Sequence, residues 1–127
     1  MALSLADRIE AVERAYEFML AYAGQGKDDA GDPAASEIRA TLTALASALD
    51  GIAEAGRAAA DGRANAQQIR DFLVVISADA GRSLSAVRLA LSTKAITSAL
   101  VDNLNGSIHL RALLTDLFVL DEAMKLG

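Results

Sequence analysis

Few side chains in this chain could do chemistry, and their types exclude most catalytic sites by counting alone. The chain has one histidine, His109, and no cysteine, so histidine pairs, thiol nucleophiles and thiolate metal sites are excluded. A di-iron bundle needs glutamate three residues before a histidine, and Gly106 stands there. Asp28-Asp29 falls in a predicted loop and Asp121-Glu122 on two sides of a predicted helix, so neither forms an acid–base pair. The sequence therefore predicts no enzyme, cofactor or metal site.

The single histidine stands in a setting that resembles a phosphoryl acceptor. The run His109-Leu110-Arg111-Ala112-Leu113, in an acidic helical chain, is similar to the motif of histidine phosphotransfer domains. That resemblance implies a signalling function in which His109 accepts the phosphoryl group. Two departures weigh against it: the basic residue stands one place early, and His109 falls in the first turn after Ser107. The alternative is a histidine at a helix start that makes an ordinary hydrogen bond.

Residues 72–91 resemble a helix-turn-helix of the repressor type, with a small residue before the turn, Gly81 in it and Val87 inside the second helix. The resemblance implies that the second helix enters the major groove and presents three side chains to DNA, Ser83, Ser85 and Arg88. Arg82 departs from the motif, because an apolar residue normally packs inward there. The net charge of −5 also offers little attraction for phosphate. DNA binding therefore stays an alternative, and nucleic acid is not the expected partner.

The composition indicates a helical framework. Apolar residues make up 53% of the chain and are mostly Ala and Leu, with one Pro and no Trp. Such a mixture favours packed helices over sheets. A chain of 127 residues can bury a core without disulfides or metals. We therefore predict an all-α, up-and-down helical bundle of four to five helices, formed by residues 1–127 as a single domain.

Capping residues and apolar spacing place the predicted helices. The first begins after Ser4, and the last begins after Ser107. The second begins at Asp32-Pro33 and carries a narrow apolar seam, formed by Ile38, Leu42, Leu45, Leu49 and Ile52. Residues 24–33, with three glycines, are predicted to form a flexible loop. Residues 53–66 hold no large apolar side chain. We expect this stretch to be mobile and to form an exposed helical end followed by a turn near Asp61-Gly62.

Five consecutive large apolar residues, Phe72 to Ile76, indicate the innermost helix. A short buried strand is the alternative, but the flanking residues Asn65 to Asp71 are typical of a helix start. A helix that is apolar on nearly every side must be surrounded by other helices. We expect this helix to end near Gly81, where the chain has its next glycine.

An apolar surplus without catalytic residues favours a protein whose function is surface recognition. In the last helix, Leu113 and Leu117 lie to one side, while Leu114 and Phe118 lie toward another. A small bundle does not easily cover both sides of a terminal helix. We therefore predict a protein–protein interaction module, an accessory or oligomeric subunit, whose self- or partner interface includes Leu114, Leu117 and Phe118. A third alternative, a bundle that encloses a small apolar ligand between its helices, stays open.

Residues 1–8 lack the basic start and the apolar run of a secretory signal. The apolar run at residues 72–76 is also far shorter than the roughly 20 residues that a membrane span requires. We therefore expect a cytoplasmic protein that has no membrane partner.

Overall fold

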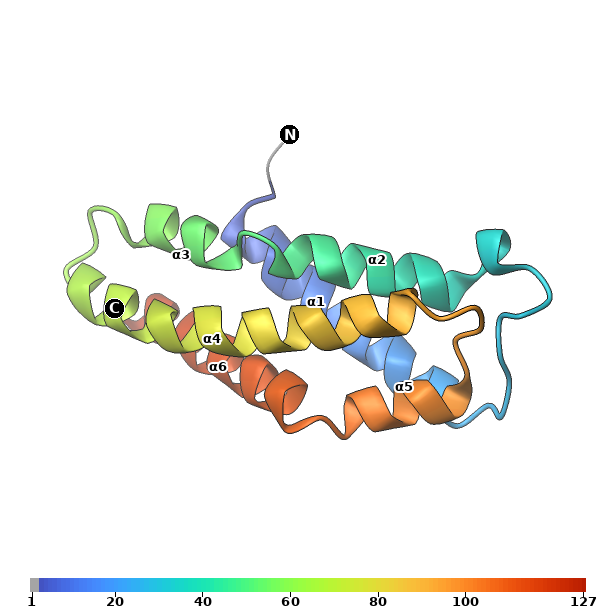
Figure 1. Ribbon diagram of the computed structural model, residues 1–127. Helices are drawn as coiled ribbons and strands as arrows, with labels where there is room; N and C mark the ends of the chain where they lie inside the picture. Colours follow the sequence, from blue (N-terminus) through green and yellow to red (C-terminus); the bar gives the residue numbers. More distant parts are fainter. Residues whose placement is uncertain (1–2) are drawn as a thin grey trace.

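The computed structural model describes residues 3–127, and the regular structure in this range is entirely helical (Figure 1). Six α-helices and one short 3₁₀ helix follow one another: α1 (Leu5–Ala23), η1 (Pro33–Ala35), α2 (Glu37–Leu49), α3 (Ile52–Ala60), α4 (Ala66–Leu91), α5 (Ser98–Asn105) and α6 (Ile108–Leu126). The all-α prediction is confirmed. The described residues form six α-helices where four to five were expected. One of the added helices arises because Gly51 divides the expected second helix into α2 and α3.

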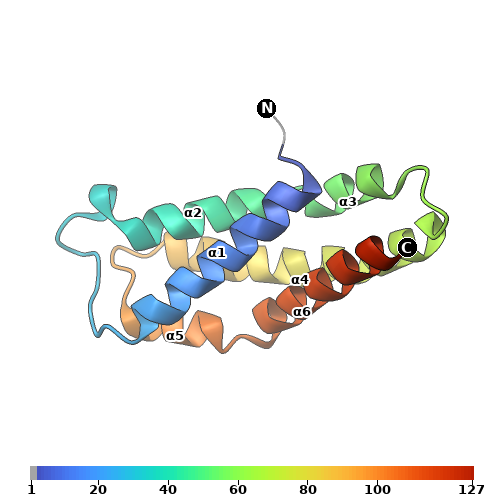
Figure 2. The same cartoon turned by 180° about the vertical axis from the view of Figure 1, so that it is seen from behind.

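The long helix α4 forms the spine of the molecule. Its 26 residues give it a length of about 39 Å, at 1.5 Å per residue. α2 and α3 follow one another along one side of α4, and α5 and α6 follow one another along the other (Figure 1). α1 crosses diagonally on the far side, where it lies on the same side of the molecule as α6 (Figure 2). Two shorter helices therefore run end to end along each side of the continuous helix α4.

Gly51 breaks the second predicted helix into α2 and α3. Its φ of 88° lies in the left-handed region, which residues with a side chain rarely adopt. The carbonyl groups at the end of α2 accept hydrogen bonds from Arg8 of α1, whose Nη1 lies 2.9 Å from the Ala48 oxygen and 3.2 Å from the Ser47 oxygen. The seam predicted to run to Ile52 within one helix therefore continues across a break that α1 stabilises.

α3 occupies most of the stretch that was predicted to be mobile. A Cβ atom added at Gly56 would lie only 2.4 Å from Cδ2 of Leu73, so α3 and α4 pack with almost no space between them. Gly56 leaves room for the buried Leu73 side chain of α4, which packs against α3 although this stretch has no large apolar side chains of its own. The turn expected near Asp61-Gly62 is confirmed, with a φ of 78° at Gly62.

α4 differs from its predicted form in two ways. It continues without interruption from Ala66 to Leu91, so the break expected at Gly81 is wrong. Leu73 and Ile76 are buried, but Val74 is 69% exposed and Val75 is 45% exposed. With 3.6 residues per turn, five consecutive apolar residues point to every side of a helix whether or not every side is covered. The helix predicted to be innermost therefore has one uncovered side.

Two of the other helices, α1 and α6, begin after the capping residues predicted for them, whereas α2 does not. The Ser4 hydroxyl accepts a hydrogen bond from the backbone of Asp7, as predicted, and α6 begins after Ser107. Pro33 begins the short helix η1 instead of α2, and α2 begins later with Ser36 as its cap.

Within residues 3–127, no helix combines the length and the apolar character that crossing a membrane requires.

The loop between α1 and α2 is fastened at Asp29, which is 8% exposed. The Asp29 carboxylate accepts hydrogen bonds from the Ile96 backbone at 2.6 Å and from Arg39 Nε at 3.0 Å. Arg39 also donates to the carbonyl groups of Leu91 and Thr93. Burial acts to raise the pKa of Asp29, but the hydrogen bonds that its carboxylate accepts from Ile96 and Arg39, together with the charge of Arg39, hold this pKa below its ordinary value. One ion pair therefore joins this loop, α2, the end of α4 and the segment before α5.

Candidate functional site

The three residues predicted to form an interface have different surroundings. Leu117 and Leu114 are 1% and 7% exposed and belong to the hydrophobic core, whereas Phe118 is 53% exposed. The prediction for Leu114 and Leu117 is therefore wrong. α6 packs mainly against α4, and α1 adds a smaller contact on the face visible in Figure 2. Of these three residues, only Phe118 is exposed to a possible partner.

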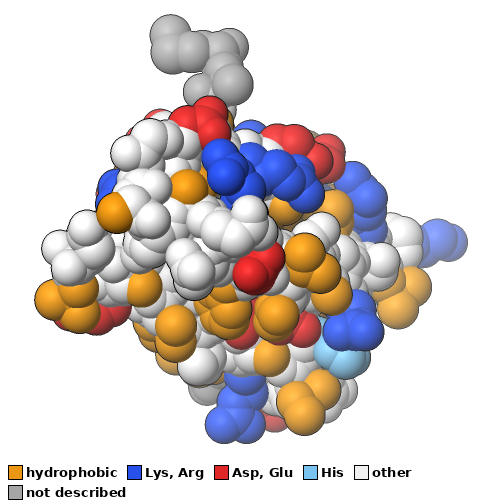
Figure 3. Space-filling view, turned by 90° about the vertical axis from the view of Figure 1, so that its left-hand side faces the viewer, with side chains coloured by type: hydrophobic (Ala, Val, Ile, Leu, Met, Phe, Trp, Pro, Cys, Tyr) orange, Lys and Arg blue, Asp and Glu red, His pale blue; other side chains and the backbone are white. Residues whose placement is uncertain are grey.

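The outer sides of α4 and α6 carry most of the large apolar side chains that are exposed. Six of them are between 45% and 74% exposed: Val74, Val75, Leu89, Ile108, Phe118 and Val119. Single exposed apolar residues are ordinary on protein surfaces, but a concentration on two neighbouring helices is informative. At the end of the molecule seen in Figure 3, hydrophobic side chains form separate groups among charged and polar ones. The long sides of α4 and α6 are therefore better candidates for an interface than this end.

Asp79 of α4 and Asp116 of α6 meet where the two helices pack together. The Asp79 side chain is 14% exposed, and Oδ2 of Asp116 is buried without a partner unless it carries a proton. Burial, together with the hydrogen bond and the charge of Asp79, raises the pKa of Asp116 to about 7. Two carboxyl groups in contact avoid double ionisation by sharing one proton. The pair therefore carries a proton that ordinary aspartates have lost by neutral pH.

The sequence reasoning missed this pair because the two residues lie on different helices. The available signal was an aspartate within each of two strongly apolar stretches, Leu73 to Ala80 and Leu113 to Leu120. Such a pair could transfer protons, which also requires a cavity that holds a substrate. Neither carboxyl group lines any of five prominent cavities formed by the described residues. The pair therefore contributes to the α4–α6 contact, with Arg82 Nη1 3.6 Å from Asp79 Oδ1 as its nearest basic group.

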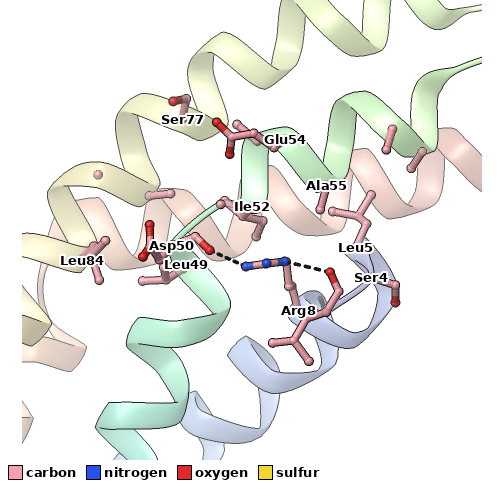
Figure 4. Close-up of a pocket in the computed structure, with 17 residues that line it drawn as sticks. Ser4, Leu5, Arg8, Leu49, Asp50, Ile52, Glu54, Ala55, Ser77 and Leu84 are labelled. Carbon is pink, nitrogen blue, oxygen red and sulfur yellow. Dashed lines mark hydrogen bonds between the residues drawn. The ribbon is translucent and has the colours of Figure 1, made fainter. Parts of the chain in front are cut away.

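The largest of these cavities, about 960 Å³, lies where α1, the α2–α3 break and α4 come together. Figure 4 shows Arg8 across this space, with its guanidinium group directed at backbone oxygen atoms. Arg8 Nε donates to the Leu3 oxygen at 3.2 Å, and Nη1 binds carbonyl groups at the end of α2. The walls are largely apolar, with Asp50 and Glu54 at one side. Because Arg8 is bound to the backbone, it fastens α1 to α2.

The residues proposed for DNA contact do not share a free surface. Ser83 is buried at 1% exposure, while Ser85 and Arg88 are exposed. All three lie in the continuous helix α4, so the turn that the helix-turn-helix resemblance requires is absent. Arg88 also lies 3.9 Å from Asp50 of the α2–α3 break. The resemblance was wrong because the small residues around Gly81 occur in the middle of a helix and not between two helices.

His109 lies in the first turn of α6, as predicted, and its side chain is exposed. Among residues 3–127, no three of His, Cys, Asp and Glu come together as a metal-binding group. The features that the structure assembles are the exposed apolar sides of α4 and α6, the carboxyl pair between these helices and the cavity beside Arg8. No family model, no curated protein and no solved structure matches this chain, so its function must be inferred from these surfaces alone.

Proposed function

We propose that this protein is a non-enzymatic helical interaction module, a small accessory or oligomeric subunit that binds another protein chain. The observation that carries the proposal is the two-sided apolar character of α4. Its inner side buries Leu73 and Ile76, while its outer side exposes Val74, Val75 and Leu89. A helix that needed only to complete the core would carry polar residues on its outer side.

The exposed apolar side chains are not required to fill the core. Buried residues from all six helices already form the core, including Leu42, Leu45 and Leu113, each at 0% exposure. Removing apolar surface from water stabilises a complex by roughly 25 cal/mol per Å² before the costs of association are counted. Covering the outer side of α4 is therefore favourable for a complex and unnecessary for the isolated fold.

The proposal includes a cytoplasmic location and a function without a cofactor. The absence of cysteine among the 127 residues is compatible with a reducing compartment. A protein partner is favoured over nucleic acid, because α4 exposes three large apolar side chains among its polar ones and the chain has a net charge of −5.

Site-specific photo-crosslinking in the cells that produce the protein tests the proposal. A photoreactive amino acid is placed at Val75 on α4, at Phe118 on α6 and, as the matched exposed control, at Ala40 on α2. We expect discrete protein adducts from position 75 or 118 that position 40 does not give. If all three positions give the same weak background, the protein has no partner on these faces and the proposal is wrong.

A phosphotransfer function is the second candidate, because His109 is exposed on a helix of an all-α protein. Phosphoramidate, a small phosphoryl donor, tests it directly. The second candidate predicts a gain of one phosphoryl group by intact mass, absent in His109→Gln and stable enough to pass to an aspartate-bearing acceptor. If the protein stays unmodified, His109 has only a structural or surface role.

A further inference from the structure

We propose that the protein forms a symmetric dimer in which α4 packs antiparallel against α4 of a second copy. The inference rests on the proposed interaction function and names the partner. Figure 1 shows α4 at the front of the molecule, with no other helix over its outer side. Among residues 3–127, this is the longest helix, so a second copy would find its longest continuous surface here.

One stripe on the outer side of α4 is complementary to itself. Its members are four, three and four residues apart, which places them on one face of the helix, and all four are exposed: Asp71, Val75, Ala78 and Arg82. In order they are an acid, two apolar residues and a base. Read in the opposite direction, the stripe presents a base, two apolar residues and an acid. Each position therefore meets its chemical complement when a second copy lies antiparallel.

The dimer axis passes between Val75 and Ala78. Around that axis, Asp71 faces the partner's Arg82, and Arg82 faces the partner's Asp71, so one contact occurs twice, as a two-fold axis requires. In the single chain, Asp71 accepts a hydrogen bond only from Gln67, at 2.9 Å. The Arg82 side chain is 58% exposed, and 3.6 Å separates its Nη1 from Asp79 Oδ1. Both charges are thus available for a stronger pairing across the axis.

The centre of the stripe suits a close helix pair. Ala78 has only a methyl group, so the two helices can approach until Val75 of each copy touches the partner's Ala78. The carboxyl contact between Asp79 and Asp116 fixes how α4 and α6 lie beside one another. Val75 is one turn from Asp79, and Val119 is nearly one turn from Asp116 in the antiparallel direction, so we infer from helix geometry that these two exposed valines are neighbours. α6 therefore extends the apolar centre of the dimer surface.

The available area is sufficient for a stable dimer. α4 and α6 have 26 and 19 residues, and at about 1.5 Å per residue and about 10 Å of width each they present about 700 Å². Specific interfaces bury about 800 Å² per partner. The outer side of α4 with the adjacent side of α6 is close to that size without any further element.

A charge exchange tests the dimer and its geometry together. Sedimentation equilibrium of the full chain across a concentration series gives the dissociation constant. We expect a mass of two chains for the natural sequence, and dimers weakened about tenfold or more by Asp71→Arg alone or Arg82→Asp alone, since like charges then meet twice. The double variant with both changes places opposite charges together again, so its dissociation constant returns to within a few-fold of the natural one.

A second test replaces an exposed apolar residue by glutamate at the dimer axis and, as the matched control, at a site away from it. Val75→Glu introduces charge at the dimer axis and should give single chains, while Leu20→Glu on α1, a site 52% exposed, should leave the dimer unchanged. Circular dichroism checks that each variant is folded. Should Val75→Glu fail to fold, the charge exchange decides the question alone.

A natural chain that stays single at every concentration overturns the dimer. So does a dimer that the double charge exchange does not restore, because its surface must then lie elsewhere. Photo-crosslinking separates these results from a failure of the proposed function: adducts to a different protein at position 75 or 118 would keep the interaction function while excluding self-association. Absence of any adduct would exclude both.

Discussion

Asp116 is the residue whose surroundings change its chemistry most. Its pKa is raised from the ordinary value of 3.8 to about 7, so the folded protein keeps a proton that the unfolded chain releases. As the pH rises from about 4 to about 7, the unfolded state is therefore favoured progressively, and the full cost is reached above the folded pKa. The carboxyl pair makes the protein more stable at mildly acidic pH than at neutral pH.

Asp116→Asn should remove most of this pH dependence. Asparagine keeps the shape of the side chain and donates an N–H to Asp79 without losing a proton. We expect a gain of about 1–2 kcal/mol in the free energy of unfolding at pH 8 and almost none at pH 4, with partial exposure reducing the effect. Urea unfolding at both pH values measures it. Glu122→Gln, an exposed change on the same helix, serves as the control, and an equal gain from it would remove the special role of Asp116.

Asp29 titrates in the opposite sense. Because its folded pKa lies below the ordinary value, its contribution to stability is complete above about pH 4 and is lost as the pH falls through the folded pKa. Its effect therefore does not overlap with that of Asp116.

Asp29→Ala should destabilise the protein by about 3 kcal/mol at pH 7, since it leaves the Arg39 guanidinium group and the Ile96 N–H without their carboxylate. Thermal unfolding at pH 7 provides the measurement. Asp28→Ala changes the neighbouring exposed aspartate, which bonds only to the nearby Ala30 backbone, and should cost well under 1 kcal/mol. Similar losses from the two variants would show that Asp29 does not fasten the loop.

At the scale of elements, the sequence predicted helices well where caps and large apolar residues coincide. The first and last helices begin after Ser4 and Ser107 as expected. The break at Gly51 escaped notice because the apolar seam continues across it, and the hydrogen bonds from Arg8 come from a helix far away in the sequence. α3 was missed because its packing depends on small residues, which have no signal in a search for large apolar ones.

The contact between Gly56 and Leu73 gives a prediction for the α3–α4 pair. Leu73 is 1% exposed, and a new methyl group at Gly56 would force its side chain to shift within the packed core. Gly56→Ala should therefore destabilise the protein by about 1–2 kcal/mol despite the better helix propensity of alanine. In a Leu73→Ala background the space is free, and the same change should become neutral or stabilising. A double-mutant cycle by chemical unfolding measures this change of sign. Equal effects of Gly56→Ala in both backgrounds would mean that α3 does not pack as closely as described.

The sequence indicated that the last helix exposes large apolar side chains, but it did not identify correctly which of them are exposed. The apolar excess in the last helix correctly indicated Phe118 as exposed, but Leu114 and Leu117 are buried. The packing of α4 and α1 against α6, which the sequence does not show, determines the covered side. The spacing from Asp71 to Arg82 is visible in the sequence, yet nothing in the spacing tells whether that side of α4 faces the core or the solvent.

Across the whole molecule, arginines fasten the bundle at two places, beside the middle of α4 and at the end of α4. Arg8 binds the end of α2, and Arg39 binds the loop together with the end of α4. These polar contacts hold the helices in place from within the chain, so the exposed apolar side chains of α4 remain available for contacts outside it. In the proposed dimer, folding and association use opposite sides of the same helix.

If α4 forms the dimer, the stability of the fold must depend on protein concentration. A partner that binds only the folded chain shifts the unfolding equilibrium by mass action, so a tenfold higher concentration should raise the midpoint of thermal unfolding by about 2–4 °C. Val75→Glu should give a midpoint that is independent of concentration, and Leu20→Glu should keep the dependence of the natural protein. Scanning calorimetry over two decades of concentration measures all three. A natural protein whose midpoint does not move, although it sediments as two chains, would show that the dimer persists after unfolding and that α4 does not hold it together.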